Sequence, residues 1–346
     1  MQFLNIIILV LICSLYNLAL AQEYHSPAQI LKILTESKVV YKIGSLKTDM
    51  HDEREGDLPL NKHGVYIGKN EAGQFVLKMY ELSPDAMVYL RNGEYYFQSG
   101  EMEKARTEYI KALETSPNNS QLMTFIGQTY GIDQNYEKAE EWYKKAIKAN
   151  YIDYLAHWFL ADIYLIKADT KKAIEEITIS HVLNRNNPRL FEKLTTIYNE
   201  NGMRYANWKF RPLYKMSKND DNSISLEYDP EHSEWMMYML CKAVWAYEPG
   251  YKENMLKNAK EIPRLVEEKE CLANLVIGYK NKNKDKKSDD EALNKLIEAV
   301  DNDRLSEFIL YEILLKEDPS IAYKIDKKSI EKIVDYVLKF RTEKFK

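Results

Sequence analysis

The segment from residue 86 to residue 187 decides the fold of this chain. Residues 86–119 read AMVYLRNGEYYFQSGEMEKARTEYIKALETSPNN, and residues 120–153 read SQLMTFIGQTYGIDQNYEKAEEWYKKAIKANYID. Residues 154–187 follow as YLAHWFLADIYLIKADTKKAIEEITISHVLNRNN. When the three copies are aligned, small residues recur 34 positions apart at Gly93, Gly127 and Ala161. A fixed period of this length predicts an array of helix-turn-helix repeats.

Four further aligned positions support the same interpretation. They are Tyr96, Tyr130 and Tyr164; Ala105, Ala139 and Ala173; Tyr109, Tyr143 and Ile177; and Ala112, Ala146 and Ser180. Small residues let two helix backbones approach closely, and the larger side chains fill the space beside each crossing. The turns between the helices are expected at Ser99-Gly100, Asp133-Gln134-Asn135 and Lys167-Ala168-Asp169. One helix pair cannot bury its apolar face alone, so neighbouring pairs are expected to stack.

The first copy resembles the tetratricopeptide repeat family. Six of its residues stand at the family's signature offsets, namely Gly93, Tyr96, Ala105, Tyr109, Ala112 and Pro117. The resemblance implies an all-α superhelix with repeats at 86–119, 120–153 and 154–187 and a degenerate fourth unit at 188–215. In that fourth unit Tyr198 and Gly202 continue the pattern, and a partner helix is expected to begin at Ala206 and Trp208.

Members of this family usually bind ligands in a concave groove lined by the first helix of each pair. By the resemblance, the groove of this chain would be lined by Met87, Leu90, Glu94, Phe97, Gln121, Thr124, Gln128, Leu155, Trp158, Asp162 and Leu165. This set is apolar and aromatic with two acids, and it lacks the Lys/Asn arrangement with which family members hold a C-terminal carboxylate. An extended or helical apolar peptide or protein segment is therefore the expected partner, anchored by Phe97 and Trp158. In the alternative, the chain's own C-terminal helices fill the groove.

The first 21 residues have the character of an export signal. Phe3 to Ala21 is apolar with few exceptions, and Ala19-Leu20-Ala21 fits the small-residue rule for signal-peptidase cleavage before Gln22. No lysine or arginine precedes the apolar run, and an uncleaved membrane anchor is the alternative. The expected location is the periplasm, the cell envelope or the exterior, without stable membrane insertion if the signal is cleaved.

Residues 22–85 are expected to contain a helix, an irregular loop and a capping helix. Ser26-Pro27 should begin the first helix, which runs to about Ser37. The charged residues around His51 are interpreted as a solvated loop in preference to a metal site. For Glu71 to Leu82 we favour a lone helix that caps the array, and the alternative is a hairpin of 65–67 with 75–79.

The chain beyond the repeats has no 34-residue phase. Residues 216–231 are expected to be a polar connection, in which the run 218–222 lacks the glycine and late glutamate of an EF-hand. Residues 229–346 are expected to form an α-helical C-terminal domain, with helices at 235–247, 251–259, 264–279, 291–300, 305–315 and 330–340. This domain contains Cys241 and Cys271, and the sequence leaves open whether they are bridged.

Composition narrows the class of function. The chain has 49 Lys and Arg against 53 Asp and Glu, which gives a formal net charge of −4 and argues against nucleic-acid binding. None of the six histidines belongs to a recognisable catalytic or metal motif, and no phosphate-binding loop is present. We therefore expect no catalytic residues, no cofactor and no metal site. The first hypothesis is an exported, non-enzymatic adaptor. The second is an enzymatic or ligand-binding C-terminal domain, which would need a pocket near Trp235, Trp245 and Tyr247.

Overall fold

The computed structural model describes residues 24–46, 64–72, 75–284 and 286–345, which divide into two compact units. Of the described residues, 64–72, 75–207 and 310–345 form the repeat unit, and 24–46, 208–284 and 286–309 form the sheet unit. The expected signal at 1–21 and the charged loop around His51 lie outside the described residues. In the described part of the chain, no helix combines the length and the apolar character needed to cross a bilayer.

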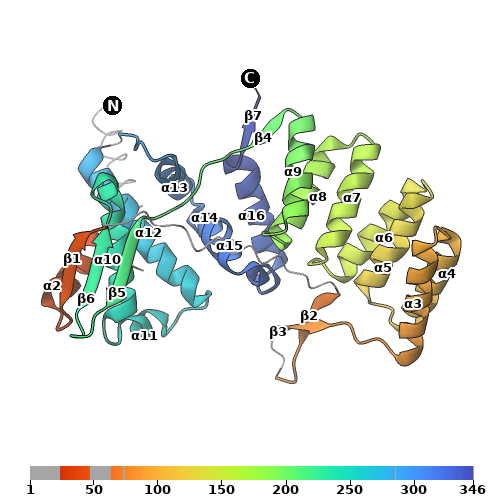
Figure 1. The fold of residues 1–346 in the computed structure, drawn as a ribbon, viewed down its shortest axis with the longest axis horizontal. Coiled ribbons are helices and arrows are strands. Elements are labelled where there is room, and N and C mark those ends of the chain that lie inside the picture. Colours follow the sequence, from red (N-terminus) through yellow and green to blue (C-terminus); the bar gives the residue numbers. More distant parts are fainter. Residues whose placement is uncertain (1–23, 47–63, 73–74, 285, 346) are drawn as a thin grey trace, which may run out of the picture. The chain divides into compact units, whose positions relative to one another are not determined.

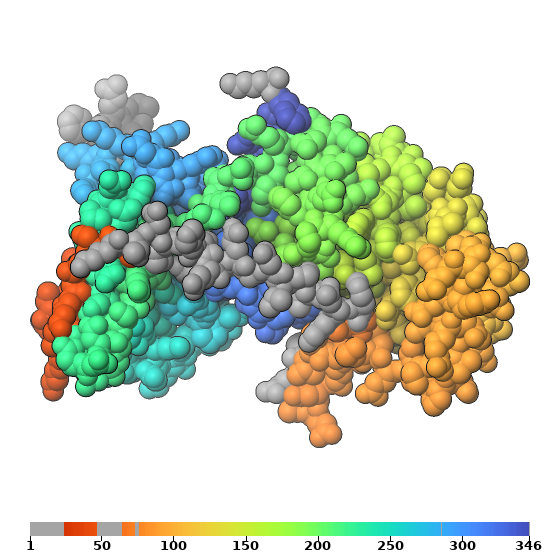
Figure 2. All heavy atoms as spheres, viewed as in Figure 1, coloured from red at the N-terminus to blue at the C-terminus, as the bar shows by residue number. Residues whose placement is uncertain are grey.

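Stacked helix pairs form the body of the repeat unit, as Figure 1 shows. The pairs are α3 (Pro84–Gln98) with α4 (Met102–Thr115), α5 (Ser120–Ile132) with α6 (Tyr136–Ala149), and α7 (Tyr154–Ile166) with α8 (Thr170–Leu183). Helix α9 (Pro188–Glu200) continues the series and packs on α8. In the space-filling view, the successive repeats follow one another from orange to green (Figure 2). The helix-turn-helix array predicted from the period is confirmed.

Glycine is needed where the two helices of a pair cross most closely. A Cβ atom added at Gly93 would lie 2.4 Å from Cε1 of Tyr109, and one added at Gly127 would lie 2.6 Å from Cε1 of Tyr143. Both tyrosines are only 3% exposed, so their rings have little room to move. In the third copy the same two positions hold Ala161 and Ile177, both completely buried. The extra methyl on one helix is thus matched by a smaller side chain on the other.

The turns and helix starts repeat with the same period. The backbone is left-handed at Gly100 (φ 79°), Gln134 (φ 60°), Ala168 (φ 56°) and Gly202 (φ 71°), each 34 residues after the last. In the second copy the left-handed residue is therefore Gln134, whereas Asn135 caps α6. The side chains that cap α5, α7 and α9 share a second phase, and they are Asn119, Asp153 and Asn187. These side-chain oxygens accept hydrogen bonds from the first backbone amides of each helix.

The expected capping helix before the array is wrong. Residues of this segment form an antiparallel hairpin of β2 (Val65–Lys69) and β3 (Phe75–Met79), with Val65 opposite Met79 and Ile67 opposite Leu77. Ser83-Pro84, directly after this segment, begins α3, because the Ser83 hydroxyl accepts from the amide of Ala86. Serine followed by proline fits a helix start better than a helix end.

The array also ends differently from the expectation. The partner helix at Ala206 and Trp208 is wrong, because α9 is followed by strand β4 (Met203–Tyr205) and an extended segment. Strand β4 pairs antiparallel with β7 (Thr342–Lys344) near the C-terminus. The C-terminal segment thereby returns to the array, where its helix α16 (Lys327–Phe340) packs on α8. The elements that precede α16 in this segment are the π-helical turn η2 (Leu310–Leu314), α15 (Leu315–Glu317) and η3 (Pro319–Tyr323).

A small mixed sheet is the centre of the other unit. Strand β6 (Ile224–Tyr228) lies between β1 (Tyr41–Ser45), which is parallel to it, and β5 (Tyr214–Lys218), which is antiparallel. Helix α10 (Met236–Tyr247) packs on this sheet and on α12 (Pro263–Asn283). The other helices of this unit are α2 (Pro27–Glu36), η1 (Pro230–Trp235), α11 (Tyr251–Leu256), α13 (Glu291–Asp301) and α14 (Leu305–Ile309). Helix α2 begins with a capping box of Ser26 and Gln29, as expected for the N-terminal helix.

The sheet unit changes the expected organisation of the second half of the chain. The polar connection expected at 216–231 is largely the hairpin of β5 and β6, with Asn222 left-handed in its turn (φ 61°). The boundary expected at residue 229 also differs from the structure. Residues 24–46 join the sheet unit because β1 pairs with β6, and residues 310–345 join the repeat unit because α16 packs on α8.

Candidate functional site

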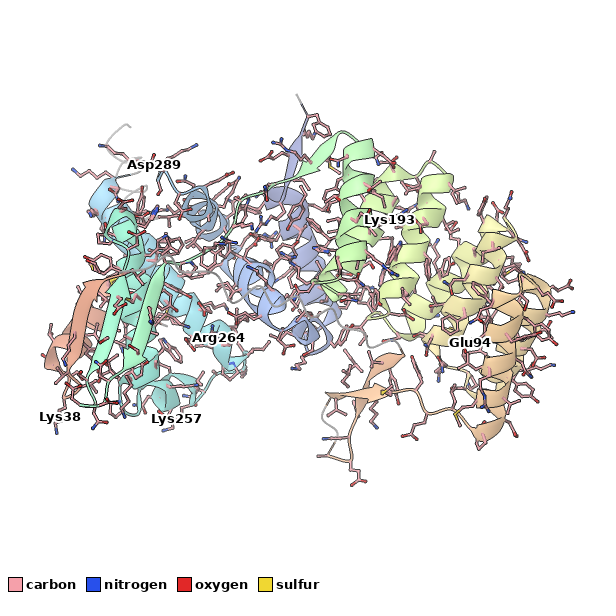
Figure 3. All side chains as sticks on the ribbon, in the orientation of Figure 1. Lys38, Glu94, Lys193, Lys257, Arg264 and Asp289 are labelled. Atoms are coloured by element: carbon pink, nitrogen blue, oxygen red, sulfur yellow. The ribbon has the colours of Figure 1, made fainter. Side chains whose placement is uncertain are left out.

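The candidate site is the surface formed by the first helices of the three repeats, α3, α5 and α7. We call it the first-helix face. Of its predicted residues, Met87 and Glu94 are exposed, and Thr124 is buried. The other eight are half-buried, namely Leu90, Phe97, Gln121, Gln128, Leu155, Trp158, Asp162 and Leu165. Figure 3 labels Glu94 on α3, the first of these helices.

Several predicted residues contribute to packing between the repeats. Leu90 and Phe97 pack against the cluster of Ala105, Tyr109 and Ile126. Leu165 packs in the same way against the cluster that contains Tyr143. These three side chains are therefore partly structural, and only their remaining exposed surface is available to a ligand. Of the two expected anchors, Trp158 belongs to neither of these packing clusters, unlike Phe97.

Two exposed isoleucines on this face escaped the prediction. Ile132 follows Gln128 by one helical turn on α5, and Ile166 follows Asp162 by one turn on α7. They are 53% and 56% exposed, respectively, and stand 34 residues apart. Their shared phase was a signal in the sequence. It was overlooked because both residues end their helices, beyond the positions that the family resemblance suggests.

The charges of the face are few. The carboxylate of Asp162 on α7 forms an ion pair with Lys193 on α9, with 2.7 Å between Oδ1 and Nζ (Figure 3 labels Lys193). Burial raises the pKa of Asp162, and the lysine opposes that shift. Of the two acids, Asp162 is therefore neutralised by a neighbouring repeat, whereas Glu94 remains exposed. The face is left predominantly apolar.

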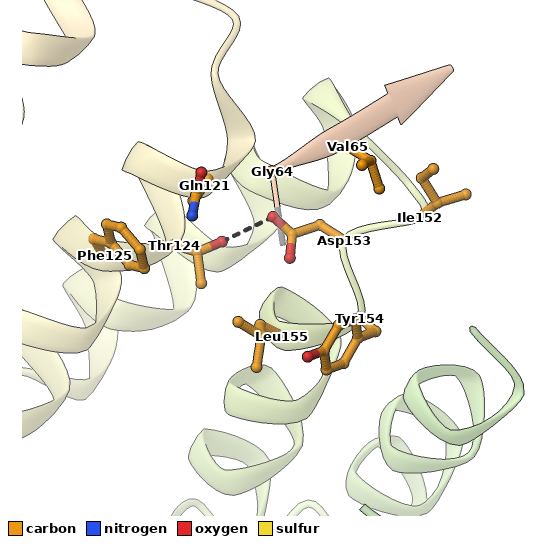
Figure 4. Close-up of a pocket in the computed structure, with 9 residues that line it drawn as sticks. All are labelled: Gly64, Val65, Gln121, Thr124, Phe125, Ile152, Asp153, Tyr154 and Leu155. Atoms are coloured by element: carbon orange, nitrogen blue, oxygen red, sulfur yellow. Dashed lines mark hydrogen bonds between the residues drawn. The ribbon is translucent and has the colours of Figure 1, made fainter. Parts of the chain in front are cut away.

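The N-terminal hairpin lies at one end of the first-helix face. The backbone carbonyl oxygen of Val65 accepts a hydrogen bond from Nδ2 of Asn150 at 2.7 Å. A small cleft of about 10 Å³, room for about one water molecule, lies between the hairpin and the first turns of α5 and α7. Figure 4 shows the residues that line it, which are Gly64, Val65, Gln121, Thr124, Phe125, Ile152, Asp153, Tyr154 and Leu155.

This contact changes the role of three predicted ligand residues. Gln121, Thr124 and Leu155 all line the cleft beside the hairpin. The Thr124 hydroxyl donates to Oδ2 of Asp153 at 3.2 Å, so it holds the start of α7. The accessible part of the first-helix face is therefore shifted toward the C-terminal ends of α5 and α7, where Ile132 and Ile166 lie.

The C-terminal segment packs on the other side of the helix pairs. Its helix α16 and the turn η3 contact α8, the second helix of the third repeat. The imidazole Nε2 of His181 on α8 lies 3.0 Å from the Tyr311 hydroxyl. Asn186, which follows α8, donates to the carbonyl oxygen of Lys316 at 2.8 Å. The segment thus covers α8, the second helix of its pair.

Titratable side chains outside the first-helix face are engaged in structural contacts. His157 is buried, with Nδ1 at 2.5 Å from Glu176 and Nε2 at 3.0 Å from the Tyr151 carbonyl. Glu248 accepts from the Tyr41 hydroxyl at 2.7 Å. Trp235 and Trp245 are buried, and each indole donates to a carboxylate. Among the described residues, no group of three or more His, Cys, Asp or Glu side chains is arranged to hold a metal ion.

Comparison with known proteins agrees with the helix pairs described above. Residues 85–150 match the tetratricopeptide repeat family. This part of the chain is a tetratricopeptide repeat array. The match covers α3 to α6, and the third tetratricopeptide repeat, α7 with α8, follows from the continued period and packing.

The relatives of this tetratricopeptide array are similar over limited lengths. Anaphase-promoting complex subunit 3 of Schizosaccharomyces pombe is 33% identical over 85 residues, which are 25% of this chain and 13% of that protein. General transcriptional corepressor trfA of Dictyostelium discoideum is 24% identical over 142 residues, which are 40% of this chain and 10% of that protein. The chain thus spans about an eighth or less of the length of these curated relatives.

Solved structures are similar over about a third of the chain. The first tetratricopeptide domain of Spaghetti (RPAP3) bound to an HSP90 peptide is 22% identical, with a TM-score of 0.32, and covers 34% of this chain and 94% of that one. The Yersinia enterocolitica type III secretion chaperone SycD, in complex with a peptide of the translocator YopD, is 17% identical. Its TM-score is 0.32, and it covers 34% of this chain and 96% of that one.

Proposed function

We propose that this protein is a non-enzymatic interaction scaffold that binds an apolar peptide or protein segment on its first-helix face. The observation that carries the proposal is the pair Ile132 and Ile166, which repeat the same phase and stay more than half exposed. Half-buried Trp158 lies on the same face of α7. Apolar side chains that are presented at regular intervals on consecutive helices form the kind of extended surface that repeat proteins use for binding.

The chemistry of the face favours an apolar segment over a charged one. Its only paired acid, Asp162, is neutralised by Lys193, and Glu94 contributes the single exposed carboxylate among the predicted residues. A partner would bury the two isoleucines and the indole of Trp158, which are residue types that contribute much of the binding energy in interfaces. An amphipathic helix with apolar residues along one side satisfies this arrangement.

A selection of short displayed peptides on the purified chain tests the proposal. We expect the selected peptides to be apolar along one side and to bind the wild type. Replacing Ile132→Glu together with Ile166→Glu should weaken their binding at least about tenfold, because each substitution places a charge in the interface. The matched control is Val40→Glu with Ile43→Glu in the sheet unit, since these residues are 60% and 58% exposed. Peptides that bind both double variants as well as the wild type would contradict the assignment of the face.

The second part of the proposal is that the scaffold acts outside the cytoplasm, in the periplasm, at the envelope or beyond it. The support is the apolar stretch Phe3 to Ala21 followed by the small-residue site before Gln22. Expression of the complete chain in a bacterial host, followed by fractionation and intact-mass analysis, tests this part. We expect the extracytoplasmic fraction to contain a chain that begins at Gln22. A chain recovered only from the cytoplasm with Met1 retained would contradict it, without affecting the binding proposal.

A further inference from the structure

The two cysteines outside the N-terminal apolar stretch face each other across the main helix interface of the sheet unit. Cys241 lies on α10 and Cys271 on α12, and both side chains are completely buried. Both are free thiols in the structure. The thiols lie within hydrogen-bonding reach of one another.

Contacts on both sides of the thiols fix their register. At one end of α10, Met237 lies beside Gly278, with 3.6 Å between its Cγ and the position of an added Cβ. At the other end, the Trp245 indole donates to Oε2 of Glu270 at 2.6 Å. Along α10 Cys241 lies between Met237 and Trp245, and along α12 Cys271 lies between Glu270 and Gly278. The pairing of the thiols thus follows from the packing of the two helices.

Buried polar contacts hold this interface in place. Glu268 is completely buried and accepts from the Tyr238 hydroxyl at 2.6 Å and from Nζ of Lys242 at 3.0 Å. Glu270, also completely buried, accepts from the Tyr251 hydroxyl at 3.0 Å. Removing one partner of such a buried contact is costly, because the other is left without compensation. The sulfur atoms are therefore held together by contacts that do not involve sulfur.

We infer that Cys241 and Cys271 are the site of an intramolecular disulfide that covalently joins α10 to α12 when the chain folds in an oxidising compartment. The inference rests on the proposed export only for the oxidising environment. The chain has three cysteines, and the third, Cys13, belongs to the expected signal. After its removal, the mature chain contains one pair and no surplus thiol.

The oxidation proceeds by thiol–disulfide exchange with a disulfide oxidant, such as oxidised glutathione or a protein disulfide oxidoreductase. One cysteine thiolate attacks a sulfur of the oxidant, which forms a mixed disulfide and releases one oxidant thiol. The second cysteine thiolate then attacks its partner's sulfur and releases the other oxidant thiol. Two electrons pass to the oxidant, and the two protons lost by the cysteines end on its two thiols.

Burial determines when this exchange takes place. It raises the pKa of both thiols, Cys271 the more strongly, so neither is a nucleophile at neutral pH once the helices are packed. Exchange therefore occurs during folding, before α10 and α12 close, or through opening of the interface. A chain that folds under reducing conditions keeps two protected thiols, and later addition of an oxidant changes it only slowly.

Refolding of the purified chain tests the inference independently of export. The chain, without residues 1–21, is unfolded in reductant and refolded in a mixture of oxidised and reduced glutathione. It is then denatured and labelled with a maleimide. We expect no labelled cysteine, an intact mass lower by two hydrogens, and a cross-linked proteolytic fragment that contains Cys241 and Cys271. The variants Cys241→Ser and Cys271→Ser should each form no cross-link and keep one thiol, which the maleimide labels after denaturation.

Two outcomes would overturn the inference. One is complete labelling of both thiols in the refolded chain, and the other is a glutathione adduct on each cysteine without a cross-link. If a single variant does not fold, the double variant Cys241→Ala with Cys271→Ala serves as the control, because it has neither thiol and can form no cross-link. A cross-link in the refolded chain together with failure of export would leave the disulfide site valid and remove its natural oxidising environment.

Discussion

Replacing Gly127→Ala tests whether the helix pairs close as the structure shows. The added Cβ would lie 2.6 Å from Cε1 and 2.8 Å from Cδ1 of Tyr143, whereas carbon atoms prefer about 3.5–4.0 Å. The ring would have to move by about 1 Å in a site where Tyr143 is 3% exposed and packs against Phe159, with ring centroids 5.8 Å apart. Such overpacking costs about 1–3 kcal/mol. Alanine regains about 1 kcal/mol of helix propensity, so we expect a net loss of up to about 2 kcal/mol.

A control on the same helix isolates the steric effect. At Gly131 an added Cβ would meet the Tyr143 hydroxyl at 3.7 Å and the Ala139 Cβ at 4.0 Å, which are ordinary contacts. Gly131→Ala should therefore stabilise the chain by up to about 1 kcal/mol, because only the propensity gain applies. Urea unfolding followed by far-UV circular dichroism measures both variants. A Gly127→Ala variant as stable as Gly131→Ala would refute the close approach of α5 and α6.

The third repeat supplies a rescue of the first substitution. Ala161 and Ile177 occupy there the positions that Gly127 and Tyr143 occupy in the second repeat. Combining Gly127→Ala with Tyr143→Ile should therefore restore part of the stability lost by Gly127→Ala alone. The two residues are in contact, so we expect a favourable coupling free energy of about 1 kcal/mol or more. Strictly additive effects would contradict a steric cause.

Three further perturbations test other parts of the fold. Gln134→Gly should stabilise the chain by about 0.5–1 kcal/mol, because this left-handed turn position holds glycine at Gly100 in the first repeat; a destabilised variant in urea unfolding would contradict this. Burial, assisted by two nearby guanidinium groups, lowers the pKa of His181 well below 6.5, so the folded chain binds fewer protons than the unfolded chain under acidic conditions. Its contribution to stability should therefore be lost as the pH falls below 6.5, by about 1.4 kcal/mol per pH unit, until the pH reaches the folded-state pKa. The variant His181→Gln should lose less stability than the wild type between pH 7.5 and 5.5, and equal losses would refute the assignment. Arg341→Met should cost about 3–5 kcal/mol, because it leaves a buried carboxylate without its partner, whereas Arg204→Met, in an exposed pair, should cost less than about 1 kcal/mol. Similar losses for the two arginine variants would contradict the burial of the first pair.

The sequence was sufficient to predict the fold of the repeats, because the contacts within and between repeats are local and periodic. Each helix of α3–α9 packs mainly on the one before and the one after it, so the same residue types recur at Gly93, Tyr109 and their equivalents. The same pattern placed the first helices correctly, and with them the face that they form. Its eleven proposed ligand residues remain a prediction, although the structure shows that Thr124 is buried and that Ile132 and Ile166 are more than half exposed.

The sequence offered the hairpin of β2 and β3 only as an alternative, and it did not predict the other strands or the return of the C-terminal segment. The hairpin of β2 and β3 and the hairpin of β5 and β6 are short, and their five-residue strands carry little periodicity. The pairings of β1 with β6 and of β4 with β7 join residues more than a hundred positions apart. Such contacts leave no repeated spacing in the chain. The same limit applies to α16, whose amphipathic pattern predicted a helix without indicating that it packs on α8.

The most direct test of the binding role observes Trp158 while a selected peptide binds. The five tryptophans are labelled with 5-fluorotryptophan, and the variant Trp158→Phe assigns the resonance of Trp158 in the fluorine NMR spectrum. We predict that a saturating peptide shifts this resonance and leaves those of buried Trp235 and Trp245 in place. A peptide that binds without moving the Trp158 resonance would contradict the assignment of the first-helix face as the binding surface.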